Sequence, residues 1–244
     1  MAVGRMAYET GYYTQAIRHF RLALEMLESG ELMHSLKARA LTGLAKSLAA
    51  IGKYAEAELM IHQALSIDEE DIDGVAGRAE DFHQLGLLCW RSGRETESLE
   101  YALKALELTN KAGHDVPDEL KAKLLKHLAV LAEQSGNTAE TERYLNKAIE
   151  FILMSPQLGK NSMIYGDVLL VKVFFLAELG RYEEAAELYP QAMQIVAMMR
   201  GLKHPRVEEA IKIFKEMENP STVLNADQTQ KMETSREASH HGIV

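Results

Sequence analysis

The sequence has little cysteine and little basic charge for its length of 244 residues. Cys89 is the single cysteine, so the chain can form no internal disulfide and no zinc site built from cysteines. Acidic residues outnumber basic ones and give a net charge of −9. A general nucleic-acid binder needs a basic face to meet phosphates, so this balance argues against such a function. We expect no nucleic-acid partner.

Long apolar segments are also scarce. The most apolar stretch, VLLVKVFFLAELG, is interrupted by Lys172 and is too short to span a bilayer. The amino terminus lacks the charged start and apolar core of a signal peptide. These absences predict a cytoplasmic location and no membrane partner.

Complete motifs of catalysis and metal binding are missing as well. The segment EEDIDGVAGRAE at 69–80 resembles a calcium-binding loop, but Glu69 stands at the first ligand position and Ala76 at the eighth, so an inter-repeat linker is favoured. The sequence contains no GxSxG motif and no phosphate-binding loop, and its nine histidines are scattered apart from a pair near the carboxyl terminus. Cys89 follows Leu85 and Leu88 on an apolar helical stripe, which favours a buried structural thiol over a nucleophile. We therefore predict no catalytic residue, no metal site and no cofactor, and hence no enzyme.

A repeated pattern takes up most of the chain. Five similar segments each begin with glycine: GYYTQAIRHFRLAL at 11–24, GKYAEAELMIHQAL at 52–65, GRETESLEYALKAL at 93–106, GNTAETERYLNKAI at 136–149 and GRYEEAAELYPQAM at 180–193. Successive glycines are 41, 41, 43 and 44 residues apart. Self-similarity at such a spacing is typical of repeat proteins.

Each repeat has the pattern of two helices joined by a tight turn. Before Gly52, apolar residues such as Leu41 and Leu44 recur at helical steps. After it, Ala57 and Ile61 do the same. Glycine suits the positive φ that ends a helix. Since no segment shows sustained strand alternation, we expect an all-α chain.

These repeats resemble the tetratricopeptide repeat. Three segments carry Gly-x-Tyr-x-x-Ala, at Gly11, Tyr13 and Ala16, at Gly52, Tyr54 and Ala57, and at Gly180, Tyr182 and Ala185. Another signature is Leu85-Gly86 followed by an aromatic, Trp90. The repeats at Gly93 and Gly136 depart from the pattern, because Tyr and Ala are replaced there. The resemblance covers about residues 1–200.

The period is longer than the 34 residues usual for this family. Longer repeats of this kind are similar to those of the kinesin-light-chain type. The segment RGLKHPRVEEA at 200–210 resembles the junction between repeats of that type, through Gly201, His204, Pro205 and Val207. This likeness does not imply kinesin binding.

The resemblance implies an all-α, right-handed α-solenoid of about five helical hairpins. We expect the solenoid to cover residues 1–218, with repeats near 1–30, 36–70, 76–112, 118–155 and 163–200. The apolar stripe Val207, Ala210 and Phe214 predicts a C-terminal capping helix over 205–218. The polar composition of 219–244 predicts a disordered tail.

In this family the first helix of each repeat lines a concave groove, where partners bind. Carried onto this sequence, the groove positions are Arg39, Thr42, Lys46, Ala49, Glu80, His83, Leu87, Trp90, Lys123, Lys126, Val130, Glu133, Asp167, Leu170, Phe174 and Ala177. As the partner-binding residues we select Arg39, Lys46, His83, Leu87, Trp90, Arg91, Lys123, Lys126 and Phe174. Trp90, the single tryptophan, is either a binding anchor or a packing residue between repeats. Solvated helix faces are the alternative for several of the others.

Basic groove positions suggest the kind of partner. Arg91, Lys123 and Lys126 meet in the middle of the groove by repeat position, and form a local positive site in an acidic protein. Such a site would select an acidic or C-terminal peptide. The five-residue clamp of chaperone-binding family members is matched outright only at Lys123, so chaperone-tail binding is not implied.

The sequence thus predicts a non-enzymatic scaffold that binds a peptide or partner helix of another protein in its groove. The alternative is a peptide-sensing regulatory module of a larger protein or complex. An RNA-binding helical array is disfavoured by the acidic balance. The first hairpin has few residues before Gly11, so apolar Val3 and Met6 predict possible self-association through the N-terminal face.

Overall fold

The structure is a computed structural model that describes residues 1–27, 34–70, 74–113, 116–201 and 205–218. In these ranges the chain folds into helices only. Their bounds are α1 (Ala2–Glu9), α2 (Tyr13–Leu27), α3 (His34–Ala50), α4 (Tyr54–Glu70), α5 (Val75–Arg91), α6 (Glu95–Ala112), α7 (Asp118–Gln134), α8 (Thr138–Met154), α9 (Met163–Glu178), α10 (Tyr182–Arg200) and α11 (Pro205–Glu218). The tail expected at 219–244 lies outside the described residues.

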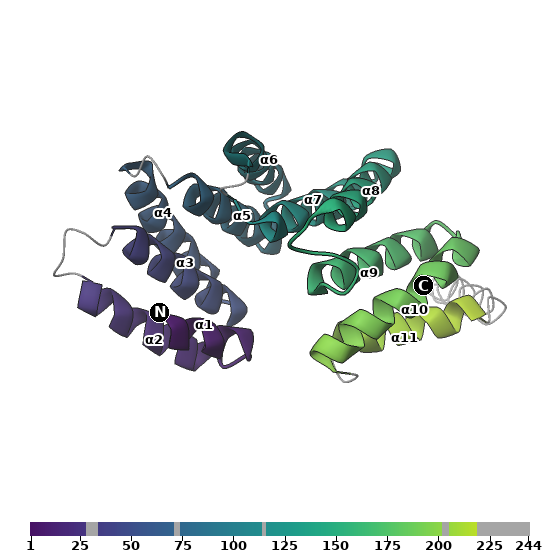
Figure 1. Cartoon of the computed structure of the whole chain (residues 1–244), viewed down its shortest axis with the longest axis horizontal. Helices are drawn as coiled ribbons and strands as arrows, with labels where there is room; N and C mark the ends of the chain where they lie inside the picture. Colours follow the sequence, from purple (N-terminus) through teal and green to yellow (C-terminus); the bar gives the residue numbers. More distant parts are fainter. Residues whose placement is uncertain (28–33, 71–73, 114–115, 202–204, 219–244) are drawn as a thin grey trace, which may run out of the picture. The chain divides into compact units, whose positions relative to one another are not determined.

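The helices form two compact bodies, and the division between them falls within α8, after Phe151. We call residues 1–151 the N-terminal body and the part from residue 152 on the C-terminal body. In the N-terminal body, successive helices pair as the hairpins α1–α2, α3–α4 and α5–α6 (Figure 1). In the fourth hairpin, α7–α8, the Lys121 ammonium of α7 lies 4.9 Å from the ring centroid of Phe151 on α8. Neighbouring hairpins pack on one another through α2 and α3, α4 and α5, and α6 and α7.

The glycines that start the repeated segments form the turns of the hairpins. Gly52, between α3 and α4, has φ of 81°, and the amide of Lys53 next to it donates to the Leu48 carbonyl at 3.0 Å. Gly11, Gly93, Gly136 and Gly180 also have positive φ, between 73° and 81°. A side chain at such a φ is strained, which explains why glycine recurs at the same point of every repeat.

The core of the N-terminal body is a continuous apolar cluster from α1 to α5. Phe20 from α2, Leu48 from α3 and Ile61 from α4 are 4%, 2% and 0% exposed. Ala16 and Ala57 are fully buried where helices approach closely. These alanines stand at the same position of their repeats, so the repeated Ala marks the helix crossing.

The helices that lie wholly in the C-terminal body are the α9–α10 hairpin and α11, and α11 contacts both helices of the hairpin. Val207 and Ala210 of α11 are fully buried, and the ring of Phe214 stacks on Tyr189 of α10 at 3.9 Å between centroids. The apolar stripe seen in the sequence therefore covers the last hairpin. The α9 helix is apolar on nearly all sides, and Val168, Leu170 and Val173 have no exposed surface.

The first hairpin differs from the others in the length of its first helix, because α1 has 8 residues and α3 has 17. On α1, Ala7 is buried, whereas Val3 and Met6 are 52% and 61% exposed. The short helix still closes one side of the N-terminal body and contributes side chains to the cavity described next.

Candidate functional site

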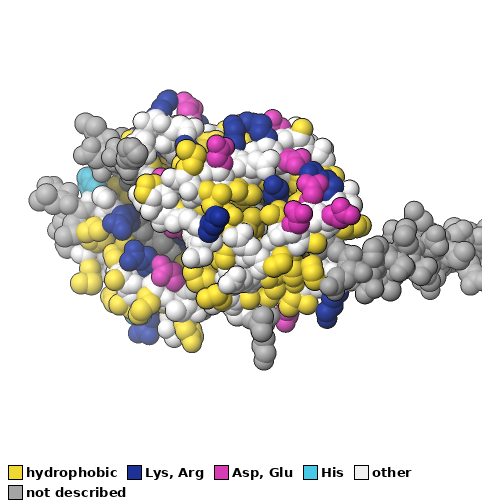
Figure 2. Space-filling view, turned by 45° about the vertical axis from the view of Figure 1, so that its right-hand side comes forward, with side chains coloured by type: hydrophobic (Ala, Val, Ile, Leu, Met, Phe, Trp, Pro, Cys, Tyr) yellow, Lys and Arg dark blue, Asp and Glu magenta, His cyan; other side chains and the backbone are white. Residues whose placement is uncertain are grey.

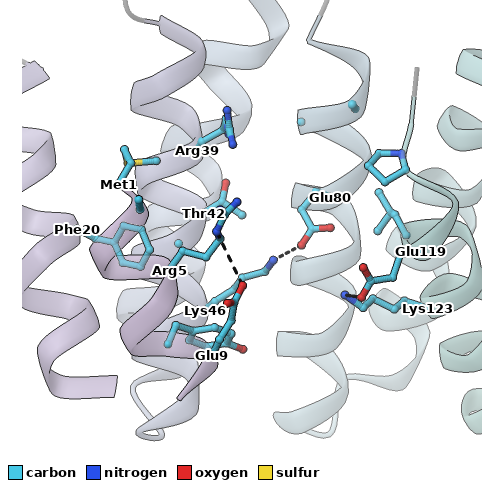
Figure 3. Close-up of a pocket in the computed structure, with 17 residues that line it drawn as sticks. Met1, Arg5, Glu9, Phe20, Arg39, Thr42, Lys46, Glu80, Glu119 and Lys123 are labelled. Carbon is cyan, nitrogen blue, oxygen red and sulfur yellow. Dashed lines mark ion pairs between the residues drawn. The ribbon is translucent and has the colours of Figure 1, made fainter. Parts of the chain in front are cut away.

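The N-terminal body contains a cavity of about 950 Å³ that the first helices of its hairpins line together. The contributing helices are α1, α3, α5 and α7, and Phe20 enters from α2. Figure 3 labels the side chains that define it, which are Met1, Arg5, Glu9, Phe20, Arg39, Thr42, Lys46, Glu80, Glu119 and Lys123. We call this cavity the groove.

Phe20 reaches the groove because two glycines leave room for its ring. A Cβ atom at Gly43 would lie 2.5 Å from the ring, and one at Gly4 would lie 3.2 Å from it. Since real Cβ atoms almost never approach another atom to 2.5 Å, no side chain fits at Gly43 unless Phe20 moves. The two glycines thus place an aromatic ring between α1 and α3, beside the groove.

A charged pair bridges α3 and α5 across the groove. The Lys46 ammonium pairs with the Glu80 carboxylate, and the two side chains are 29% and 28% exposed (Figure 3). Burial alone would raise the pKa of Glu80, but the charge of Lys46, with His83 and Lys123 beyond it, lowers that pKa to about 2. Burial opposes the charge of Lys46 too, yet Glu80 raises its pKa. Both groups therefore stay ionised at neutral pH.

Two further ion pairs lie along the groove, each within one helix. Arg5 and Glu9 of α1 are 3.9 Å apart, and Lys123 and Glu119 of α7 are 2.8 Å apart. Their side chains are between 43% and 69% exposed, so these pairs contribute little to stability. Their consequence is local, since each places a carboxylate beside a groove cation.

A layer of buried polar side chains lies behind the groove, on α3, α5 and α7. The Thr42 hydroxyl is 2.6 Å from Asp81 Oδ1 and 3.0 Å from the Ala38 carbonyl oxygen, and Asp81 has no exposed surface. His83 and His127 are 3% and 4% exposed, and their rings meet edge to face at 5.7 Å. This layer joins three first helices through polar contacts.

Burial holds both histidines neutral. It lowers the pKa of His83 to about 3, against the opposing charge of Glu80, and lowers that of His127 to about 4, with help from Lys126. The Ser98 hydroxyl donates to the Gly86 carbonyl at 2.7 Å and lies 3.3 Å from His127 Nε2. Because that hydroxyl proton is engaged, Nε2 carries the ring proton and donates to Ser98. The Nδ1 atoms of both rings have no hydrogen-bond partner among the described residues.

The groove positions carried over from the family divide into two sets. Arg39, Lys46 and Lys123 line the groove, and so do Thr42 and Glu80. The remaining positions do not, and the selected residues among them are His83, Leu87, Trp90, Arg91, Lys126 and Phe174. His83 belongs to the buried layer, and Phe174 lies on α9 in the C-terminal body.

Trp90 and Arg91 make contacts between hairpins. The Trp90 indole N–H donates to Gln134 of α7 at 2.8 Å, and its ring packs against His127 and the apolar cluster of Leu128 and Leu131. Arg91 donates to the Ala49 carbonyl at 3.3 Å. Trp90 therefore makes the packing contacts expected between repeats, and its role as a binding anchor stays a prediction.

The sequence reasoning did not include Glu9 and Glu119, two of the three acidic side chains of the groove, or the wall that α1 forms. Arg5 and Glu9 were overlooked because α1 is short, although their spacing of four residues is typical of a helical ion pair. Glu119 and Lys123 have the same spacing. Lys123 therefore has a carboxylate partner within its own helix.

Other chemistry has little support in the described part of the chain. No group of three His, Cys, Asp or Glu side chains there could hold a metal ion. Cys89 has no exposed surface, and burial raises its pKa, as expected for a structural thiol. None of the described helices combines the length and hydropathy needed to cross a membrane.

Comparison with known sequences identifies the repeats. Tetratricopeptide-repeat family models match residues 82–111 and 173–206. The chain is also 30% identical over 120 residues to the Photosystem I assembly protein Ycf3 of Synechococcus elongatus and of another Synechococcus. That match covers 48% of this chain and 65% of each relative, so the chain spans just under two thirds of their length.

Solved structures share the fold at low sequence identity. A Rap protein crystallised with Competence and Sporulation Factor has a TM-score of 0.71 and 16% identity, over 97% of this chain and 70% of its own. A putative kinesin light chain from Podosopora anserina, with nearly identical TPR-like repeats, has a TM-score of 0.57 and 17% identity, over 82% and 94%. The expected all-α solenoid fold is confirmed, and the family models identify tetratricopeptide repeats at residues 82–111 and 173–206.

Proposed function

We propose that this chain is a protein-interaction module that binds an extended peptide segment of a partner in the groove of its N-terminal body. The observation that carries the proposal is the cavity of about 950 Å³ lined by α1, α3, α5 and α7. Four successive first helices contribute to it, so a bound chain would contact every hairpin of that body. The module acts by binding and has no reaction of its own.

The lining suits a peptide. Apolar groups such as Phe20 and Leu120 lie beside charged groups such as Arg39 and Lys123. Binding sites for organic ligands combine apolar walls with a few polar groups that fix orientation. A peptide presents the same mixture, because apolar and charged side chains alternate along its backbone.

Two relatives support this kind of partner. The Rap protein of similar fold was crystallised with Competence and Sporulation Factor, and the Synechococcus relative is named for the assembly of Photosystem I. The likeness to the Rap protein, which extends over 97% of this chain, favours the second candidate, a peptide-sensing regulatory module. Both candidates use the same groove. They differ in the consequence of binding, which is assembly with the partner for the first and regulation of a larger protein or complex for the second.

A labelling experiment tests the groove. The native thiol, Cys89, is buried, so a cysteine introduced at an exposed position can be modified alone. Ala2 lines the groove, and Ala139 on α8 is an exposed control that does not. Peptides are first selected on the full chain from a random displayed library. Labelling Ala2→Cys with a bulky maleimide should abolish their binding, whereas labelling Ala139→Cys should leave it unchanged. Equal binding by both labelled proteins would place the peptide site elsewhere.

A further inference from the structure

The charges of the groove do not cancel. Its lining includes four basic side chains, Arg5, Arg39, Lys46 and Lys123, and three acidic ones, Glu9, Glu80 and Glu119. Three of the basic groups each pair with one of the acids. Arg39 is the fourth, and it makes no ion pair and no hydrogen bond to any residue that the structure describes.

Each acidic side chain of the groove pairs with another basic group, and none pairs with Arg39. Glu80 accepts hydrogen bonds from Lys46 and also from Gln84 Nε2 at 3.0 Å, and Lys46 keeps it ionised. Glu9 and Glu119 pair within their own helices. In Figure 3, Arg39 lies on α3 apart from all three of these pairs. One exposed guanidinium is therefore left to meet whatever enters.

From this layout we propose that Arg39 binds the carboxylate of an acidic side chain within the peptide, and so selects acidic sequences. The inference rests on the proposed function and deepens it. A guanidinium presents parallel N–H donors whose geometry matches a carboxylate, which makes a paired, oriented contact possible. Lys46 and Lys123 are less available, because a ligand carboxylate would first have to displace Glu80 or Glu119.

The position of Arg39 in the groove favours a side chain over a chain terminus. Lining residues of α1 lie on one side of α3, and those of α5 and α7 lie on the other (Figure 3). A peptide can thus pass Arg39 in both directions. The acidic residue would lie in the interior of the bound segment.

Two matched variants isolate the contact. Arg39→Gln and Lys37→Gln remove the same charge from the same helix, but Lys37 does not line the groove. Arg39 is exposed and has no partner among the described residues, so its replacement should leave the fold intact. The full chain and both variants are used to select displayed random peptides, which have no free carboxyl terminus.

Peptides selected on the natural chain and on Lys37→Gln should be enriched in Asp or Glu at one position. Those selected on Arg39→Gln should lose this enrichment, and synthetic acidic peptides should bind it about tenfold more weakly. Arg39→Glu should instead enrich Lys or Arg at that position. Amidating the carboxyl terminus of the synthetic peptides should leave their binding unchanged.

The outcomes separate this inference from the proposed function. Peptides that lose binding when Ala2→Cys is labelled, but show no acidic preference, would overturn the role of Arg39 and leave the groove in place. Binding that requires a free carboxyl terminus would also overturn it. Failure to select any peptide that the Ala2→Cys label blocks would refute the groove itself.

Discussion

At the scale of single residues, the clearest feature of the groove is that its charges are arranged in pairs. The Lys46–Glu80 pair joins α3 to α5, and Glu80 also accepts from Gln84. A partly buried pair is costly to form, but removing one partner leaves the other desolvated and uncompensated. The pair therefore helps to set how α3 and α5 face each other across the groove.

Replacing Lys46 by Met should lower the free energy of unfolding by about 1–3 kcal/mol, because Glu80 loses the charge that offsets its burial. This range is discounted for the 28% exposure of Glu80. The double variant Lys46→Met/Glu80→Gln should lose less than the sum of the single variants. Urea unfolding of all four proteins at pH 7 measures the cycle, and additive losses would show that the pair is not coupled.

The buried histidines make stability depend on pH. In the unfolded chain they bind protons near pH 6.5, whereas the fold keeps the pKa of His83 near 3 and that of His127 near 4. The unfolded state therefore binds more protons between these values, so stability falls as the pH falls. Each histidine should remove about 2 kcal/mol between pH 7 and pH 5.

His127→Gln tests this dependence, because an amide can still donate to Ser98 but does not titrate. The variant should lose about half of the pH-dependent change of the natural chain between pH 7 and pH 5. His62→Gln, an exposed control on α4, should retain all of it. Denaturant midpoints at several pH values provide the comparison, and an unchanged slope for His127→Gln would show that folding does not lower the pKa of His127.

At the scale of helices, the packing of α1, α2 and α3 depends on glycines that let an aromatic ring come close to the backbone. Phe20 of α2 is 4% exposed and fills the space that the missing side chains of Gly4 and Gly43 leave on α1 and α3. Alanine usually stabilises a helix by about 1 kcal/mol over glycine. At Gly43, steric overlap with a buried ring opposes that gain.

Gly43→Ala should therefore destabilise the chain by about 1–3 kcal/mol, since the ring must shift in a packed core. Phe20→Leu should relieve the overlap, so that in the Gly43→Ala background it costs less than it does in the natural chain. Thermal unfolding of the single and double variants gives the comparison. A higher melting temperature for Gly43→Ala would mean that the Phe20 ring can shift without loss of packing, and that this wall of the groove is deformable.

The sequence predicted the helices better than it predicted the site, and the reason is the range of the contacts involved. The turn at Gly52 and the buried Ala57 follow from spacing within one repeat, which a single stretch of sequence contains. Lys46 pairs with a residue of the next hairpin, so its partner depends on how two repeats stack. Trp90 likewise contacts Gln134 of another hairpin. No local sequence pattern distinguishes a tryptophan that packs between hairpins from one that is free to anchor a partner.

At the scale of the whole molecule, charge opposes the ligand that the groove selects. The chain has a net charge of −9, and Figure 2 shows acidic and basic side chains interspersed on the face it displays. An acidic peptide is therefore repelled at long range and held at short range by one guanidinium. These two effects act on different steps, since long-range charge affects encounter and a direct contact affects release.

Binding kinetics separate the two effects. Arg39→Gln and Lys37→Gln each remove one positive charge, which takes the net charge from −9 to −10, so both should slow association of a selected acidic peptide by the same small factor. Only Arg39→Gln should speed dissociation, by about tenfold, because only that variant loses the contact.

Added salt should raise the association rate of all three proteins, because it screens the long-range repulsion. The Debye length falls from about 10 Å at 0.1 M to about 3 Å at 1 M. The difference in dissociation rate should persist in salt, because salt screens a contact enclosed between peptide and groove less than it screens charges on the open surface. Equal dissociation rates for the two variants would mean that the peptide does not touch Arg39.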